Sequence, residues 1–169
     1  MSTKEFLNKI LNGAAMGIVV GLIPSAIFGA IFSALAQYSS VFATLSQIVT
    51  AITFTVPALV GMFIALEFKL TSIESAALIG ATFVSSGAAR LVDGAWVLKG
   101  TGDLINIMIT ASIAVLIIKW YDNRVKNLGI VIVPILGGVL PAFIGLLTLP
   151  YVGQLTGLLG SLIANFTNL

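Results

Sequence analysis

The chain contains a run of 57 residues, from Ile10 to Leu66, without one charged side chain. A second charge-free run extends from Asn127 to the last residue, Leu169. As a single helix the first run would be about 85 Å long, whereas the hydrocarbon core of a bilayer is roughly 30 Å thick. We therefore expect the first run to cross a membrane and return, and the second is also long enough for two spans.

Composition supports a membrane protein. Hydrophobic residues make up 59% of the chain and charged residues 8%, against roughly 25% charge in soluble domains. The mean hydropathy is +1.14. The net charge of +2 comes from Lys and Arg near segment ends, which is typical of membrane topology and not of a nucleic-acid surface. We predict one all-α, polytopic membrane domain that spans residues 1–169.

Cysteine and histidine are both absent. Their absence excludes disulfides, thiolate chemistry, imidazole metal ligands, and phosphohistidine or phosphocysteine relays within this chain. The six carboxylates show no metal-binding spacing, and no GxSxG or phosphate-binding glycine loop accompanies them. We therefore expect no catalytic site, no metal and no cofactor, and we do not expect an enzyme.

Six apolar segments are predicted. The third and fourth are expected to be short. Their uncharged runs, Ser75–Ala89 and Leu104–Ile118, have 15 residues each, which is roughly 22 Å of helix. These two segments either cross the membrane or are re-entrant. The predicted boundaries are approximately Gly13–Ala36, Val41–Leu66, Ser72–Ala89, Thr101 or Asp103 to Trp120, Leu128–Leu149, and Tyr151–Phe166, with Pro150 between the last two.

The basic residues predict the orientation. If the N-terminus is cytoplasmic, six Lys and Arg side chains lie in the cytoplasm and two, Arg90 and Lys99, lie on the other side. This asymmetry favours N-in, and six spans then also give C-in. The apolar run from Ala14 to Ala34 is too long for the core of a signal peptide, so we expect this segment to be retained.

Small residues recur at four-residue spacing in the first, third and sixth segments. Such ridges let helix backbones approach closely in lipid, where no hydrophobic force drives association. The pattern predicts packing within one chain or dimerisation between chains. The ridges are Gly13, Gly17, Gly21, Ser25 and Gly29; Ala77, Ala81, Ser85 and Ala89; and Gly153, Gly157 and Ser161.

The polar stretch Arg90–Asn106, which links the two short segments, is the best candidate for a substrate site. Short, glycine-interrupted segments expose helix ends to cargo in transporters. Each polar residue of this stretch also has a structural interpretation. Thr101 or Asp103 caps the fourth segment. Arg90 and Asp93 form a surface ion pair or contact cargo. Trp96 is an interfacial anchor or stacks on a sugar ring.

Two further polar features extend the candidate site. Asn106 lies one turn into an apolar helix and either bonds a neighbouring helix or contacts substrate. Thr50 and Thr53 align with Ser46 on one face of the second segment, ahead of Pro57. Their hydroxyls either bond back to the helix backbone or line a cavity.

Three stretches carry a resemblance to a known family. They are residues 6–13 (FLNKILNG) with 16–24 (MGIVVGLIP), residues 54–61 (FTVPALVG), and above all residues 100–106 (GTGDLIN). With these the chain resembles, over nearly its whole length, bacterial membrane proteins described as enzyme IIC components of the sugar phosphotransferase system. The resemblance implies a multi-pass sugar permease of the bacterial inner membrane. It also implies a dimer and separate proteins as phosphoryl carriers.

The chain departs from that family pattern in two respects. It has no histidine, and no glutamate lies in an obvious mid-membrane position. It is also shorter than the proteins it resembles, as a half-size member or a fragment would be. Our first hypothesis is a sugar-permease-like homo-oligomer. The second is a non-transporting scaffold, receptor or regulatory subunit with permease-like architecture, because fold does not fix function. The third is an oligomeric channel.

Overall fold

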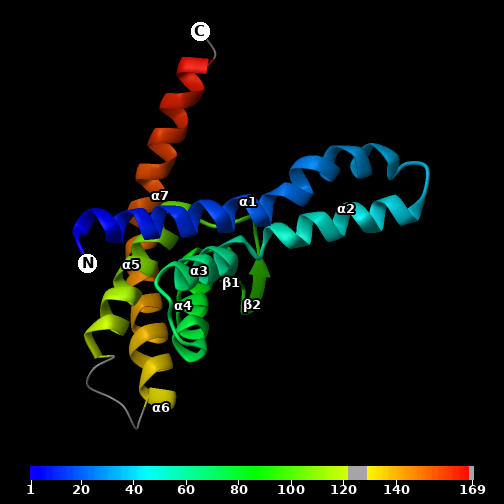
Figure 1. The fold of residues 1–169 in the computed structure, drawn as a ribbon. Coiled ribbons are helices and arrows are strands. Elements are labelled where there is room, and N and C mark those ends of the chain that lie inside the picture. The colour runs from blue at the N-terminus through cyan, green and yellow to red at the C-terminus, as the bar shows by residue number, and fades with distance from the viewer. Residues whose placement is uncertain (122–128, 168–169) are drawn as a thin grey trace.

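The computed structural model describes residues 1–121 and 129–167 and is mainly helical (Figure 1). Helix α1 crosses one side of a bundle formed by α3, α4, α5 and the long C-terminal helix. In chain order the elements are α1 Thr3–Leu35, α2 Ser40–Thr53, α3 Val56–Glu67, α4 Ser72–Ser85, β1 Ala89–Val92, β2 Ala95–Leu98, α5 Leu104–Tyr121, α6 Gly129–Val133, the π-helix η1 Pro134–Val139, and α7 Leu140–Thr167.

Helix α1 begins ten residues earlier than expected, because Ser2 caps it and accepts a hydrogen bond from the Glu5 amide. Its glycine ridge packs against α3. A Cβ atom at Gly17 would lie 2.5 Å from the Cα and N atoms of Val60, and one at Gly13 would lie 2.7 Å from those of Ile64. Packing within the chain is therefore confirmed for this part of the ridge.

The second predicted segment is broken in two. Helices α2 and α3 meet at a bend of 47°. The bend coincides with Pro57, which has no amide hydrogen and occupies the first turn of α3, where that donor is not needed. As a result α2 follows the second half of α1 away from the bundle, whereas α3 returns along the first half (Figure 1).

Helix α4 is 14 residues long and ends at Ser85, four residues before the predicted end. Its N-cap is Thr71, because Thr71 and Glu74 form a reciprocal capping box. At 14 residues the helix is roughly 21 Å long, so it is too short to cross a hydrocarbon core of about 30 Å. The prediction of a short third segment is confirmed.

The link after α4 is a β-hairpin, so the expectation of an entirely α-helical fold is wrong here. Strands β1 and β2 pair antiparallel, with Val92 opposite Ala95. The two turn residues, Asp93 and Gly94, have φ values of 50° and 81°. Two consecutive positive φ angles are what a type I′ turn requires, and Asp-Gly is a preferred sequence for it. All residues from Arg90 to Leu98 are exposed.

The predicted break between a fifth and a sixth segment at Pro150 is wrong. Helix α7 runs through Pro150 without a turn, and α6, η1 and α7 follow one another as a continuous helix. The backbone absorbs Pro134 in the π-helical turn η1, where Gly137 and Gly138 are buried against α4 and α5. The sequence also predicts a charged loop over Tyr121–Asn127; Tyr121 belongs to α5, and the rest of that loop lies outside the described residues.

Three helices are long and apolar enough to span a membrane, namely α1, α5 and the helix from Ile130 to Ala164, and the bent α2–α3 pair would make a fourth. The six predicted spans are therefore not found among the described residues. The expectation that the fourth segment is short is also wrong, because α5 continues to Tyr121 and has 18 residues. The buried core lies where α1, α3, α4 and α5 meet, around Val60, Ile64, Leu78, Ile107 and Val115. Two regions extend beyond it, the α1–α2 hairpin and the second half of α7 (Figure 1).

Candidate functional site

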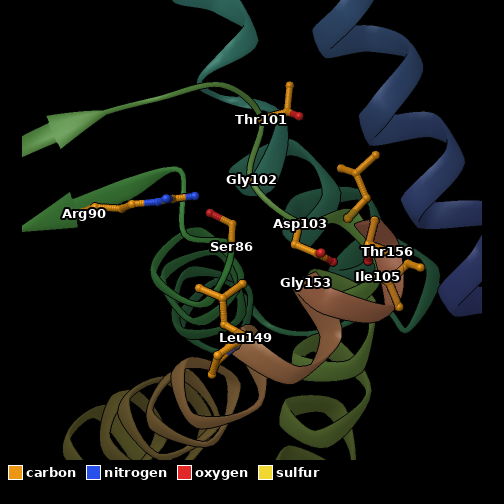
Figure 2. A pocket seen from close by; sticks show the side chains of 11 residues that line it. Ser86, Arg90, Thr101, Gly102, Asp103, Ile105, Leu149, Gly153 and Thr156 are labelled. Carbon is orange, nitrogen blue, oxygen red and sulfur yellow. The ribbon is translucent and has the colours of Figure 1, made fainter. Parts of the chain in front are cut away.

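A cavity of about 720 Å³ lies at the end of the bundle where α4 stops and α5 starts. Figure 2 shows its wall, which is built from the start of β1, the loop before α5, and α7 near its proline. The volume falls within the 300–1,000 Å³ of ordinary small-molecule sites. The lining residues are Ser86, Arg90, Thr101, Gly102, Asp103, Leu104, Ile105, Leu149, Pro150, Gly153 and Thr156.

The loop before α5 is held against the end of α4. The Asp103 amide donates to the carbonyl oxygen of Ser86 at 2.8 Å. Between them Gly102 has a φ of 72°, and a Cβ atom there would lie 2.5 Å from the Ser86 carbonyl oxygen. Only glycine accommodates both the left-handed backbone and this close approach. The Gly-Thr-Gly sequence thus fixes Thr101 and Asp103 at the cavity wall.

Asp103 caps helix α5. Its Oδ1 atom accepts a hydrogen bond from the Asn106 amide at 2.8 Å, which satisfies a donor in the first turn of the helix. Of the two predicted caps, Asp103 is therefore confirmed. The carboxylate also lines the cavity, beside Thr101. Capping and cavity lining are compatible, because a carboxylate has a second oxygen that can accept from a ligand.

Arg90 supplies a cation to the same cavity. Its Nε donates to the Gly87 carbonyl oxygen at 2.6 Å, which orients the guanidinium toward Ser86 (Figure 2). The predicted ion pair with Asp93 is not among the salt bridges of the described residues. In a hairpin Asp93 belongs to the turn, so the three-residue spacing no longer brings the two side chains together.

Asn106 joins three helices. Its side-chain amide donates to the carbonyl oxygens of Ser85 in α4 and Gly145 in α7, each at 2.8 Å, and its Oδ1 accepts from Thr148 at 2.7 Å. The residue is fully buried. The interhelical interpretation of Asn106 is therefore confirmed, and the side chain lies behind the cavity wall.

Four other candidate residues lie outside the cavity. Asp93 and Trp96 are on the hairpin, where Trp96 is 73% exposed. Thr50 and Thr53 lie on α2, and their hydroxyls donate to the carbonyl oxygens of Ser46 and Thr50. Back-bonding to the helix is thus confirmed for these two threonines.

The contribution of α7 was missed by sequence reasoning. Leu149, Pro150, Gly153 and Thr156 complete the wall opposite Asp103. The predicted boundaries divide them between the fifth segment, which ends at Leu149, and the sixth, which begins at Tyr151, because Pro150 is expected to break the helix. Leu149, Gly153 and Thr156 follow one another at spacings of four and three residues and share one helix face, a signal that only a helix continuous through Pro150 makes visible.

The arrangement is suited to a neutral, hydroxyl-rich solute. Arg90 offers donors, the Asp103 carboxylate offers an acceptor, and the Thr101 hydroxyl can do both. The hydroxyls of Ser86 and Thr156 already donate to the carbonyl oxygens of Phe83 and Val152. The described residues include no group of three acidic side chains that could hold a metal ion. The wall offers Arg90 and Asp103 as charged groups for hydrogen bonds to the solute.

A family model described as "Phosphotransferase system, EIIC" matches residues 8–169 of the chain. The match covers the glycine ridge of α1, the Gly-Thr-Gly-Asp loop and the whole of α7. The comparison with curated proteins gives no match. The comparison with solved structures gives none either.

Proposed function

Because the chain belongs to the phosphotransferase system EIIC family, we propose that it binds a sugar in the cavity between α4, α5 and α7 for transport across the membrane. The family and the apolar helices make it a membrane protein of the sugar-permease class. The observation that carries the proposal is the cavity itself. It brings Arg90, Asp103 and three hydroxyl side chains together at the end of a helix too short to span the bilayer.

The polar wall of the cavity supports a sugar as the substrate class. Ring hydroxyls both donate and accept hydrogen bonds, and a guanidinium and a carboxylate form the strongest of these. Leu104, Ile105 and Leu149 provide an apolar side against which the C–H face of a sugar ring can pack. A helix that ends before it has crossed the membrane exposes polar groups to cargo in transporters, and α4 is short enough to do so.

Substituting the charged wall residues is expected to weaken sugar binding. Arg90→Gln removes a charge-assisted hydrogen bond, so the dissociation constant should rise about tenfold or more. Asp103→Asn should have a similar effect, because asparagine preserves the N-cap of α5 while it removes the charge. Equilibrium binding of a panel of monosaccharides to the purified protein in nanodiscs measures both effects.

Lys99→Gln is the matched control, because Lys99 is a cation near the same hairpin but does not line the cavity. Its dissociation constant should stay within about twofold of the wild type. If the protein binds no sugar, or if Arg90→Gln and Asp103→Asn bind as the wild type does, the proposal fails. A dedicated protein partner recovered from native membranes without solute flux would then support the scaffold hypothesis.

A homo-oligomer is part of the proposal. The second half of α7 leaves the bundle with its small-residue ridge uncovered, since Cβ atoms at Gly153 and Gly157 would meet nothing within 4 Å. A second copy can pack closely on such a ridge in lipid. Light scattering of the purified protein in detergent should therefore give twice the mass of one chain, whereas a monomer would contradict this assembly.

The N-terminus is proposed to be cytoplasmic, in a bacterial inner membrane. Lys4, Lys9, Lys69 and Lys119 support this orientation, because the positive-inside rule places such residues in the cytoplasm. The expected C-in arrangement required six spans. With Ile130–Ala164 as one helix, roughly 50 Å long, we propose instead that the C-terminus lies on the other side of the membrane. Reporter fusions at both termini test this arrangement. Phosphoryl transfer is assigned to separate carrier proteins, and no enzymatic role is proposed for this chain.

A further inference from the structure

Two lysines from distant parts of the chain meet at one aromatic ring. Lys9 in α1 and Lys119 in the last turn of α5 place their Nζ atoms 5.6 Å and 5.3 Å from the centre of the Phe68 ring. The ring is fixed, because Phe68 is buried and packs against Phe6 with ring centres 5.2 Å apart. The Nζ atoms of Lys9 and Lys119 can therefore be no further apart than the sum of their distances from the ring centre, 5.6 Å and 5.3 Å.

The two cations are poorly neutralised by the described residues. Lys9 forms an exposed ion pair with Glu5 at 3.9 Å, and Lys119 has no ion pair in residues 1–121 and 129–167. Close in sequence to the packed pair Phe6 and Phe68, Lys4 and Lys69 add positive charge, and Glu67 adds one carboxylate. Like charges near one ring repel each other, and an anion bound between them removes that repulsion.

The surface next to Lys119 suits lipid chains. Leu116 lies one turn deeper along α5 and is 57% exposed, and Ile109 continues the same face two turns further on. Trp120 is 61% exposed beside the lysine. An exposed tryptophan above an apolar strip is typical of the membrane interface. This cluster lies about 22 Å along α5 from the cavity, so it is a separate site.

We propose that Lys9 and Lys119 bind the phosphate of an anionic phospholipid, with its acyl chains along the Ile109–Leu116 face of α5. Basic pockets between helices on the cytoplasmic side are suited to such headgroups, and the ammonium groups supply charge-assisted hydrogen bonds to phosphate oxygens. Phe68 limits the movement of both lysine stems, so less side-chain entropy is lost when the lipid binds.

Fluorescence quenching tests this site directly, because the chain has two tryptophans. Trp96→Phe leaves Trp120 as the single reporter. In nanodiscs, phosphatidylglycerol brominated near its headgroup should quench Trp120 more strongly than phosphatidylcholine brominated at the same carbons. The double variant Lys9→Gln/Lys119→Gln should lower this preference about thirtyfold, since each lysine near the membrane surface contributes about a fivefold preference for an anionic lipid.

The matched control is Lys4→Gln/Lys69→Gln, which removes two charges at the same end but leaves both cations at Phe68 in place. It should keep the lipid preference, and equal loss in both double variants would overturn the site in favour of diffuse surface charge. Lys9→Arg/Lys119→Arg should restore the preference, which guards against a folding defect in the glutamine variant. Equal quenching by both lipids in the wild type, or full competition by inorganic phosphate, would also overturn the proposal.

Discussion

Replacing Asn106 with leucine is expected to lower the free energy of unfolding by about 2–3 kcal/mol. The change removes three interhelical hydrogen bonds and leaves the carbonyl oxygen of Ser85, at the end of α4, without this donor. Leucine has the same heavy-atom branching as asparagine but larger terminal groups, so the loss reports on the missing hydrogen bonds together with a tighter fit. Unfolding of the purified protein by sodium dodecyl sulfate in mixed micelles, followed by circular dichroism, measures the difference.

Two neighbouring substitutions calibrate this result. Thr148→Val removes the hydrogen bond to the Asn106 Oδ1 atom and should cost about 0.6 kcal/mol. Ser112→Ala removes a hydroxyl on the same helix that bonds back to Met108, and its effect should stay within about 0.5 kcal/mol. If Asn106→Leu is as stable as the wild type, the three bonds do not hold α4, α5 and α7 together.

The same substitution should also affect the proposed site. Asn106 fixes the end of α4 relative to α5 and α7, and these elements carry Ser86, Asp103 and Leu149 in the cavity wall. Since the side chain itself lies behind the wall, weaker sugar binding in Asn106→Leu would reflect a displaced wall and not a lost ligand contact. Sugar affinity should therefore fall together with stability in this variant, whereas Arg90→Gln should change affinity alone.

Gly17→Val is expected to be the more severe change, with a loss of about 3 kcal/mol or more. The added side chain would collide with the backbone of Val60, which cannot rotate away as a flexible side chain can. Helix α1 would then have to separate from α3, and the core around Val60 and Ile64 would open. The yield of monodisperse protein in size-exclusion chromatography and the unfolding midpoint in sodium dodecyl sulfate measure the effect.

Gly29→Val is the matched control on the same helix. A Cβ atom at Gly29 would meet only the hydroxyl oxygen of Ser25, at 3.3 Å, within the same turn of helix. Because α3 does not reach this part of α1, the variant should stay within about 0.5 kcal/mol of the wild type. Equal damage from both substitutions would mean that the ridge packs along its whole length, contrary to the structure.

Charge and glycine patterns predicted the features that depend on local chemistry. The charge-free run to Leu66 indicated a membrane protein, and the Gly13, Gly17 and Gly21 spacing indicated a close helix pair. A cap at Thr101 or Asp103 followed from residue type and position, because capping involves only neighbouring backbone amides, and the structure shows that Asp103 is the cap. The short third segment likewise followed from length alone.

Proline misled the prediction because its effect depends on its surroundings. Pro57 sits at a bend, whereas Pro150 sits inside a continuous helix. Both remove one backbone donor, and the sequence around them does not show whether neighbouring helices compensate for it. The Asp93-Gly94 turn was a different kind of error, since its hairpin signal was present in the sequence and was read as an irregular link.

The sequence by itself determined that this chain belongs in a bilayer, that its glycine ridge permits a close helix contact, and that Thr101 or Asp103 caps the fourth segment. Those properties follow from transfer free energy, side-chain size and local hydrogen bonding. Only the tertiary structure decided that α7 passes Pro150 to complete the cavity with Asp103, and that Lys9 meets Lys119 at Phe68. Such meetings depend on helix directions, which packing between distant segments sets and no local pattern encodes.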